Sequence, residues 1–137
     1  YFKSLTSFMS HFSYIKTSIR EMDLLKKSLT NLNIAWKQEE KEILGYNGET
    51  HNVNLVIPQE NNIDIGFEKT SENYYQLVAD LSFWDQSSSL EHFLDRLHKE
   101  YAITTVLQET KKKGFQTVSQ ENTQNGEVVI MVERWSN

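Results

Sequence analysis

The sequence predicts an α+β fold, a mainly antiparallel sheet with two principal helices packed on one face. Several short segments alternate apolar and polar residues, as half-buried strands do. Two other segments repeat apolar residues every three or four positions, the spacing of a helix that buries one face. Strand patterns precede, separate and follow the two helical segments, and this order favours α+β over a parallel α/β sheet.

The N-terminal part of the domain predicts one strand and the first helix. Residues 11–19 interleave polar with apolar and β-branched residues, which indicates a strand. Ser18 and Glu21 have the spacing of a capping box and mark the expected helix start. The expected buried stripe of this helix consists of Met22, Leu25, Leu29 and Leu32.

The middle of the chain predicts mostly antiparallel strands. A short strand is expected over residues 34–37, and the Gly45-Tyr46-Asn47-Gly48 run predicts a loop or turn. Residues 53–57, 63–68 and 75–81 alternate as strands with one wet face do. Pro58 lacks a backbone donor and ends the first of these strands.

The second helix has the strongest periodicity in the chain. Ser88 and Glu91 form a second expected capping box. Lys111 to Lys113 complement the negative end of a helix dipole, and Gly114 stands where a terminal glycine belongs, so the helix is expected to end at Lys113. Its expected buried residues are Leu90, Phe93, Leu94, Leu97 and Tyr101.

The C-terminal residues predict a last pair of strands, over residues 115–120 and 128–135. Asn125-Gly126 between them is a strong hairpin signal, and both residues are expected to take a positive φ.

Length and composition limit the classes of protein to which this sequence can belong. The 137 residues suit one domain, expected over residues 9–137, with residues 1–8 an upstream or processed segment before Met9. The absence of cysteine excludes disulfides, thiolate metal sites and thiol catalysis. The net charge of −5 disfavours nucleic-acid binding, and no apolar run is long enough to span a membrane. We therefore expect a soluble, mildly acidic protein.

The titratable residues form no catalytic or metal motif with a diagnostic spacing. His98 has Glu91 and Asp95 on the same helix, an arrangement that suits a ligand or acid/base group but also an ordinary solvated face. Strand register brings Asp64 near Asp80 if their strands pair, which would give a carboxylate pair for acid/base chemistry. No phosphate-binding loop is present. We therefore expect no tightly bound metal, nucleotide or other cofactor.

Aromatic residues are more abundant than a small core requires on one face. Trp84 follows an expected strand, and Trp135 stands beside Arg134 near the C-terminus. Trp and Arg are favoured at interface hot spots, whereas core packing is the simpler use of a tryptophan. Trp84, Arg134 and Trp135 are therefore the candidate partner-binding residues.

Five short motifs occur in order along the chain: Met9-Ser-His-Phe-Ser, Gly45-Tyr-x-Gly48, Asp64-Ile-Gly-Phe67, Leu77-Val-Ala-Asp-Leu81 with Trp84, and Arg134-Trp-Ser136. Together they resemble a plastid hypothetical reading-frame family, the Ycf family numbered thirty-five, of red-algal and related chloroplasts and of cyanobacteria. The resemblance covers essentially everything after Met9. Leu44 and Asn47 stand where the family pattern has basic residues. The resemblance implies a soluble protein of the plastid stroma, or of the cyanobacterial cytoplasm, and it implies no catalytic residue.

Two hypotheses about function follow. The first is a non-catalytic accessory module that binds an unidentified protein of the photosynthetic or carbon-assimilation machinery. The second is a small enzyme that uses Asp64 and Asp80 with His98 as acid/base groups. An exposed aromatic patch favours the first hypothesis, and a closed polar pocket favours the second.

Overall fold

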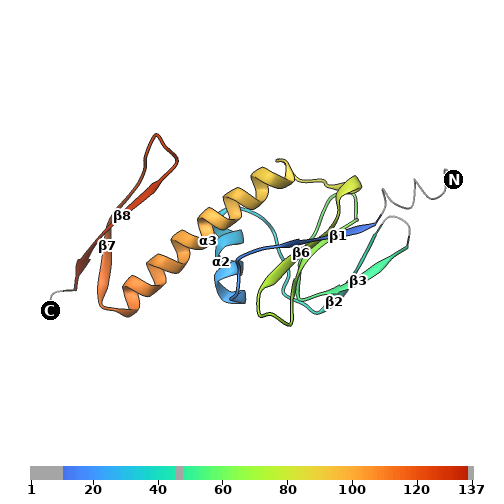
Figure 1. The fold of residues 1–137 in the computed structure, drawn as a ribbon, viewed down its shortest axis with the longest axis horizontal. Helices are drawn as coiled ribbons and strands as arrows, with labels where there is room; N and C mark the ends of the chain where they lie inside the picture. The colour runs from blue at the N-terminus through green and yellow to red at the C-terminus, as the bar shows by residue number, and fades with distance from the viewer. Residues whose placement is uncertain (1–10, 46–47, 136–137) are drawn as a thin grey trace.

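A four-stranded antiparallel sheet in the order β1-β6-β5-β4 forms the centre of the computed structural model, which describes residues 11–45 and 48–135 (Figure 1). The prediction for residues 1–8 lies outside the described residues. Register pairs Tyr14 of β1 with Val78 of β6, and Val78 with Gly66 of β5. The strands are β1 (Phe12–Lys16), β4 (Leu55–Ile57), β5 (Ile65–Lys69) and β6 (Tyr75–Asp80).

Both helices cover the same face of this sheet, as predicted. Helix α2 (Met22–Asn31) contributes Leu25 and Leu29 to the main hydrophobic core, and α3 (Leu90–Lys112) contributes Phe93 and Leu97. These side chains pack on the sheet residues that point to the helices, which are Leu55, Ile57, Ile65, Phe67, Tyr75, Leu77 and Ala79. The α+β prediction is confirmed.

The two predicted capping boxes are both wrong in detail. Glu21, not Ser18, is the N-cap of α2, and it makes no capping hydrogen bond with its side chain. The Tyr101 hydroxyl of α3 instead accepts hydrogen bonds from the backbone nitrogens of Arg20 and Glu21, each at 3.2 Å. At α3 the cap is Ser89, whose hydroxyl accepts from the His92 backbone nitrogen. Tertiary contacts, which local spacing does not encode, decide the start of α2.

The other face of the sheet is covered by a hairpin that the sequence did not predict. Strands β2 (Lys41–Leu44) and β3 (Thr50–Val53) pair with each other. Ile43 and Val53 form a second hydrophobic cluster with Phe12, Val56 and Val78 of the sheet. The expected strand over residues 34–37 is reduced to one bridge between Lys37 and Val56, and residues 53–57 divide at Asn54 into β3 and β4.

Gly66 of β5 lets this hairpin approach the sheet. A Cβ atom at this position would lie 2.8 Å from the Leu55 carbonyl oxygen and 2.8 Å from Cγ2 of Val53. Only glycine leaves that space free, so the approach of β3 to β5 depends on it.

The last two strands form a separate two-stranded sheet, here called the C-terminal ribbon, made of β7 (Phe115–Asn122) and β8 (Val128–Arg134). Figure 1 shows it at the end of α3 that is far from the β2–β3 hairpin. Gly114 has a φ of 83°, which ends α3 as predicted. Gly126 has a φ of 80° as predicted, but the prediction of a positive φ is wrong for Asn125. The turn needs one left-handed residue, and its Gly126 nitrogen donates to the Thr123 carbonyl oxygen at 3.1 Å.

Candidate functional site

The C-terminal ribbon exposes more of its apolar side chains on one face than on the other. No residue of β7 or β8 is fully buried. Side chains alternate along β8, so Val129 and Met131 share one face, here called the outer face. Trp135 directly follows β8 and still bonds to Gly114 through its backbone nitrogen, so the same alternation assigns its side chain to this face. The exposed fractions of these three side chains are 43%, 58% and 54%. The ribbon therefore presents a strip of large apolar groups to solvent.

The opposite, inner face of the ribbon is turned to α3. Val128 and Ile130 on this face are only half exposed, whereas Val132, nearer the C-terminal end of β8, is 38% exposed. Gln120 and Asn122, their partners on β7, line a cavity of about 260 Å³ together with side chains of α3. The remaining lining residues of this cavity are Leu32, Arg96, Lys99, Glu100 and Ile103. The fold itself thus shields the inner face in part and leaves the outer face open.

The charged side chains on the outer face are acidic. Glu133 follows Met131 by two positions, and Glu121 lies opposite Val129 on β7. Glu127, just after the turn, continues the alternation of Val129 and Met131. Within the described part of the ribbon, Arg134 is the only basic side chain, and its alternation places it on the inner face. The outer face is therefore apolar with acidic flanks.

The structure separates the two C-terminal candidates for partner binding. The Arg134 guanidinium lies 4.8 Å from the centroid of the Phe115 ring, its partner across the ribbon, in a cation–π contact. Trp135 donates its backbone N–H to the Gly114 carbonyl oxygen at 2.8 Å, while its indole remains exposed. Arg134 is thus engaged within the ribbon, and Trp135 is free to meet another surface.

Trp84, the third candidate, has contacts within the fold. Its ring meets Phe93 of α3 edge-on, with centroids 5.2 Å apart. Its indole N–H donates to the Ser88 carbonyl oxygen at 2.8 Å. The side chain is half-buried and packs against the main core. The structure therefore gives Trp84 a packing role beside any binding role.

The first candidate acid/base group, Asp64, fastens a loop. It precedes β5, and its carboxylate accepts a hydrogen bond from the Gln59 backbone nitrogen at 2.9 Å. The buried Gln59 side chain in turn donates to the carbonyl oxygens of Ile63 and Phe83 and accepts from the Asp85 nitrogen. Asp64 thus belongs to a network that holds the β4–β5 connection against the segment after β6.

Asp80 and His98 do not join Asp64 in a shared site. Asp80 is buried at the end of β6, and its Oδ1 accepts from the Ser82 nitrogen at 3.2 Å. Oδ2 of Asp80 and Nε2 of His98 have no hydrogen-bond partner among the described residues. Across residues 11–45 and 48–135, no hydrogen bond or ion pair links the three side chains, and no group of three His, Asp or Glu residues is arranged to hold a metal ion.

Sequence reasoning missed a hydrogen-bonded chain of three side chains from three strands. The Tyr14 hydroxyl of β1 lies 3.3 Å from His51 Nδ1 on β3, and His51 Nε2 lies 3.0 Å from Glu68 Oε1 on β5. Gln76 of β6 donates to the same Glu68 oxygen at 2.7 Å. In the tautomer that carries its hydrogen on Nε2, His51 donates a hydrogen bond to the Glu68 carboxylate, and Nδ1 accepts one from the Tyr14 hydroxyl. Residues 37 positions apart in the sequence meet only because the unpredicted hairpin folds over the sheet.

This hydrogen-bonded series of side chains fastens the β2–β3 hairpin to the sheet. Burial, followed by the nearby Glu49 and Glu68 carboxylates, raises the pKa of the Tyr14 hydroxyl above its usual value. The hydroxyl therefore stays protonated at neutral pH and serves as a hydrogen-bond donor. No covalent chemistry is required to explain the arrangement.

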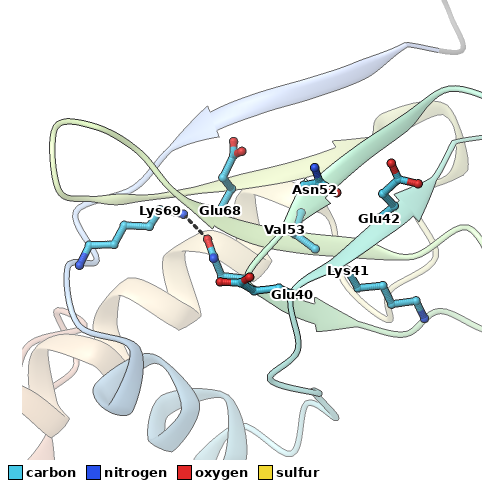
Figure 2. Close-up of a pocket in the computed structure, with 8 residues that line it drawn as sticks. Glu40, Lys41, Glu42, Asn52, Val53, Glu68 and Lys69 are labelled. Atoms are coloured by element: carbon cyan, nitrogen blue, oxygen red, sulfur yellow. Dashed lines mark hydrogen bonds between the residues drawn. The ribbon is translucent and has the colours of Figure 1, made fainter.

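A cavity of about 630 Å³ lies beside this chain, with Glu68 on its wall (Figure 2). Figure 2 shows the Lys41 and Lys69 side chains extending to opposite sides, away from Glu40 near the middle. The Lys69 backbone nitrogen donates to the Asn54 side chain at 2.8 Å. The other lining residues are Glu42, Asn52 and Val53. Tyr14 and His51 do not line this cavity, so it does not complete an acid/base site around them.

Comparison with known proteins shows a family match over most of the chain. Residues 28–131 match the family described as "Protein of unknown function (DUF1257)". The chain is 43% identical over 127 residues to "Uncharacterized protein ycf35" of Guillardia theta, which covers 93% of this chain and 98% of the relative. Identity to the protein of the same name from Pyropia yezoensis is 41% over 128 residues, covering 93% of this chain and 99% of the relative. The resemblance found in the sequence motifs is thus confirmed.

No solved structure matches the chain significantly. No helix of the described residues has the length and apolar character needed to cross a membrane.

Proposed function

Because the chain belongs to the family of the Ycf35 proteins, with its DUF1257 match, we propose that it is a non-catalytic accessory module that binds another protein through the outer face of its C-terminal ribbon. The family resemblance supports a place in the plastid, on the stromal side. We further propose that the partner is a component of the photosynthetic or carbon-assimilation machinery.

The exposure of the C-terminal ribbon is the observation that carries this proposal. A two-stranded ribbon is at best marginally stable in water when nothing covers it. Here the apolar outer face, with Val129, Met131 and Trp135, has no covering element among the described residues. Exposed apolar strips on otherwise well-packed proteins mark surfaces that meet a partner. The proposal therefore names Trp135 as its main contact residue.

Quantitative capture from the plastid of origin tests the proposal. Tagged wild-type protein and the Trp135→Ala and Met131→Ser variants are compared for the same co-purifying protein, which is then purified and titrated. Trp135→Ala should weaken that titrated affinity by about 2 kcal/mol, a hot-spot effect. Both substitutions lie outside the core, so the urea midpoint should hardly change.

Leu44→Ser is the matched control, because the Leu44 side chain on β2 is 54% exposed, as much as Trp135. It removes an equally exposed apolar group far from the C-terminal ribbon. Recovery of the partner should then match wild type. The proposal would be contradicted if Leu44→Ser and Trp135→Ala reduced partner recovery equally. It would also be contradicted if Trp135→Ala and Met131→Ser both recovered the partner in full.

A further inference from the structure

Strand β8 has a free edge with its backbone groups available. Among the described residues β8 pairs only with β7, and β7 is the strand that packs against α3. The Thr123 nitrogen donates to the Glu127 carbonyl oxygen, so Glu127 faces β7. Alternation in an antiparallel pair then directs the backbone N–H and C=O of Val128 and Ile130 to the free side.

The middle of β8 has no residue that protects this edge. Val128 to Val132 are five consecutive apolar residues without proline or lysine, the two residues that commonly block strand addition. An edge of this kind pairs readily with another extended chain. The edge is therefore suited to receive one more strand.

The side chains beside this edge have an order that specifies a partner. On the outer face the alternation along β8 reads Glu127, Val129, Met131, Glu133 and Trp135, that is, acid, apolar, apolar, acid, aromatic. Glu133 already accepts a hydrogen bond from the Gln116 amide on β7, which fixes its position on this face. A complementary strand carries basic residues opposite the two acids and apolar residues between them.

We propose that β8 binds an extended segment of another protein that carries the alternating pattern basic, apolar, apolar, basic, added as a third strand to the C-terminal ribbon. This inference rests on the proposed function and names the chemistry of the partner at the same surface. Main-chain hydrogen bonds to Val128 and Ile130 supply the pairing, and Glu127 and Glu133 select the segment by charge. Trp135 extends the contact beyond the second acid.

Charge argues against a second copy of this chain as the occupant. Two symmetric antiparallel pairings of β8 strands have their centre near the middle of the strand. In the pairing centred on Met131, which spans Val128–Arg134, Glu133 of each copy lies opposite Val129 of the other, so it meets no basic side chain. In the pairing centred on Ile130, Glu127 of each copy lies opposite Glu133 of the other. Like charges placed directly across a strand pair are destabilising. The acidic outer face repels its own copy and attracts a basic segment.

A synthetic seven-residue peptide, Lys-Thr-Val-Thr-Val-Thr-Lys, tests the proposal by calorimetric titration of the full chain. The pattern is palindromic, so it fits a parallel or an antiparallel strand. We expect binding that weakens with salt and slows hydrogen exchange of the Val128 and Ile130 amides. Replacing both lysines of the peptide by glutamate should lower affinity about tenfold, from two reversed cross-strand charge pairs.

Charge reversal on the protein provides the reciprocal test. The Glu127→Lys and Glu133→Lys double variant should bind the glutamate peptide better than the lysine peptide. Glu42→Lys on the exposed strand β2 is the charge control and should leave the preference for lysine unchanged. Ile130→Pro removes an N–H on the free side while the ladder to β7 is kept, so it should abolish peptide binding. If the Ile130→Pro variant does not fold, the peptide preference of the charge-reversal double variant still tests the proposal.

The possible failures are distinguishable. If the lysine peptide does not bind while Trp135→Ala still loses the captured partner, strand addition is wrong and the proposed function stands. If the two peptides bind equally, the selection by Glu127 and Glu133 is wrong. A concentration-dependent dimer in sedimentation that Ile130→Pro abolishes would overturn the inference in favour of a second copy. Peptide binding with unchanged capture by Trp135→Ala would refute the proposed function and, with it, the biological use of this edge.

Discussion

Strands β6 and β8 have similar apolar character but opposite surroundings. β6 reads Tyr-Gln-Leu-Val-Ala-Asp, and every residue of it except Gln76 is buried. β8 reads Val-Val-Ile-Met-Val-Glu-Arg, and none of its residues is buried. β6 lies between β1 and β5, with helices on one face and the β2–β3 hairpin on the other. β8 has one neighbour, so its apolar residues have nothing to pack against on the outer face.

The difference shows that apolar alternation predicts a strand but does not predict what covers it. Burial requires layers on both faces, and only the central sheet has them. Stability is then unequally distributed: the central sheet should open only on global unfolding, while the C-terminal ribbon should open locally. Substitutions in the two regions should therefore differ in their effect on global stability.

The largest expected difference separates Leu97→Ala in α3 from Met131→Ala in β8. Leu97 is fully buried in the main core, so its truncation leaves a cavity and should cost about 2 to 5 kcal/mol. Met131 is exposed, and its truncation should change the free energy of unfolding by less than about 0.5 kcal/mol. Urea unfolding followed by circular dichroism measures both. Similar losses for the two variants would show that the ribbon is part of the core.

The sequence predictions succeeded for features set by local periodicity and failed for features set by what covers an element. The stripe of α3 that holds Phe93 and Leu97 was predictable because helical periodicity is a local signal. The β2–β3 hairpin was not, since Lys41 and Glu42 precede the one buried residue of β2, Ile43, and no alternation is visible. Its packing depends on Gly66, which lies far along the sequence.

The candidate sites were predictable only in part. Trp135 stood out by residue type, and the structure leaves it exposed. Asp64 and Asp80 stood out by their strand positions, yet each is engaged by a nearby backbone nitrogen instead. The link from Tyr14 through His51 to Glu68 needs three strands in two layers, so no spacing along the chain could indicate it.

Gly66→Ala is expected to separate the β2–β3 hairpin from the central sheet. Its Cβ would meet the Leu55 carbonyl oxygen and the Val53 side chain at distances no real Cβ shows, so β3 must move. Overpacking of this kind should cost about 1 to 3 kcal/mol. Hydrogen exchange should accelerate in β2 and β3 but stay unchanged in the C-terminal ribbon. Acceleration in the ribbon as well would mean that the two regions unfold together.

Alkaline pH should destabilise the central fold through Tyr75. Burial, followed by Asp23 and Tyr101, raises the pKa of its hydroxyl above the usual value. Above about pH 10 the unfolded chain loses this proton while the folded protein keeps it, so stability falls as pH rises from there through the folded pKa. Tyr75→Phe should flatten this fall in urea melts between about pH 9 and 11. Parallel curves for variant and wild type would exclude Tyr75 as its source.

The smallest global effect is expected from Gly126→Ala in the ribbon turn, because the strain stays local. Gly126 has a φ of 80° and open space around its Cα, so alanine meets a conformational penalty of about 1 to 2 kcal/mol without any clash. Since β7 and β8 bury no residue, this penalty should be released by local opening of the ribbon. Hydrogen exchange in β7 and β8 should therefore accelerate by about tenfold, while the global free energy of unfolding changes by less than about 0.5 kcal/mol. A global loss equal to the local one would show that the ribbon opens only with the rest of the fold, and the contrast between β6 and β8 would then concern exposure alone.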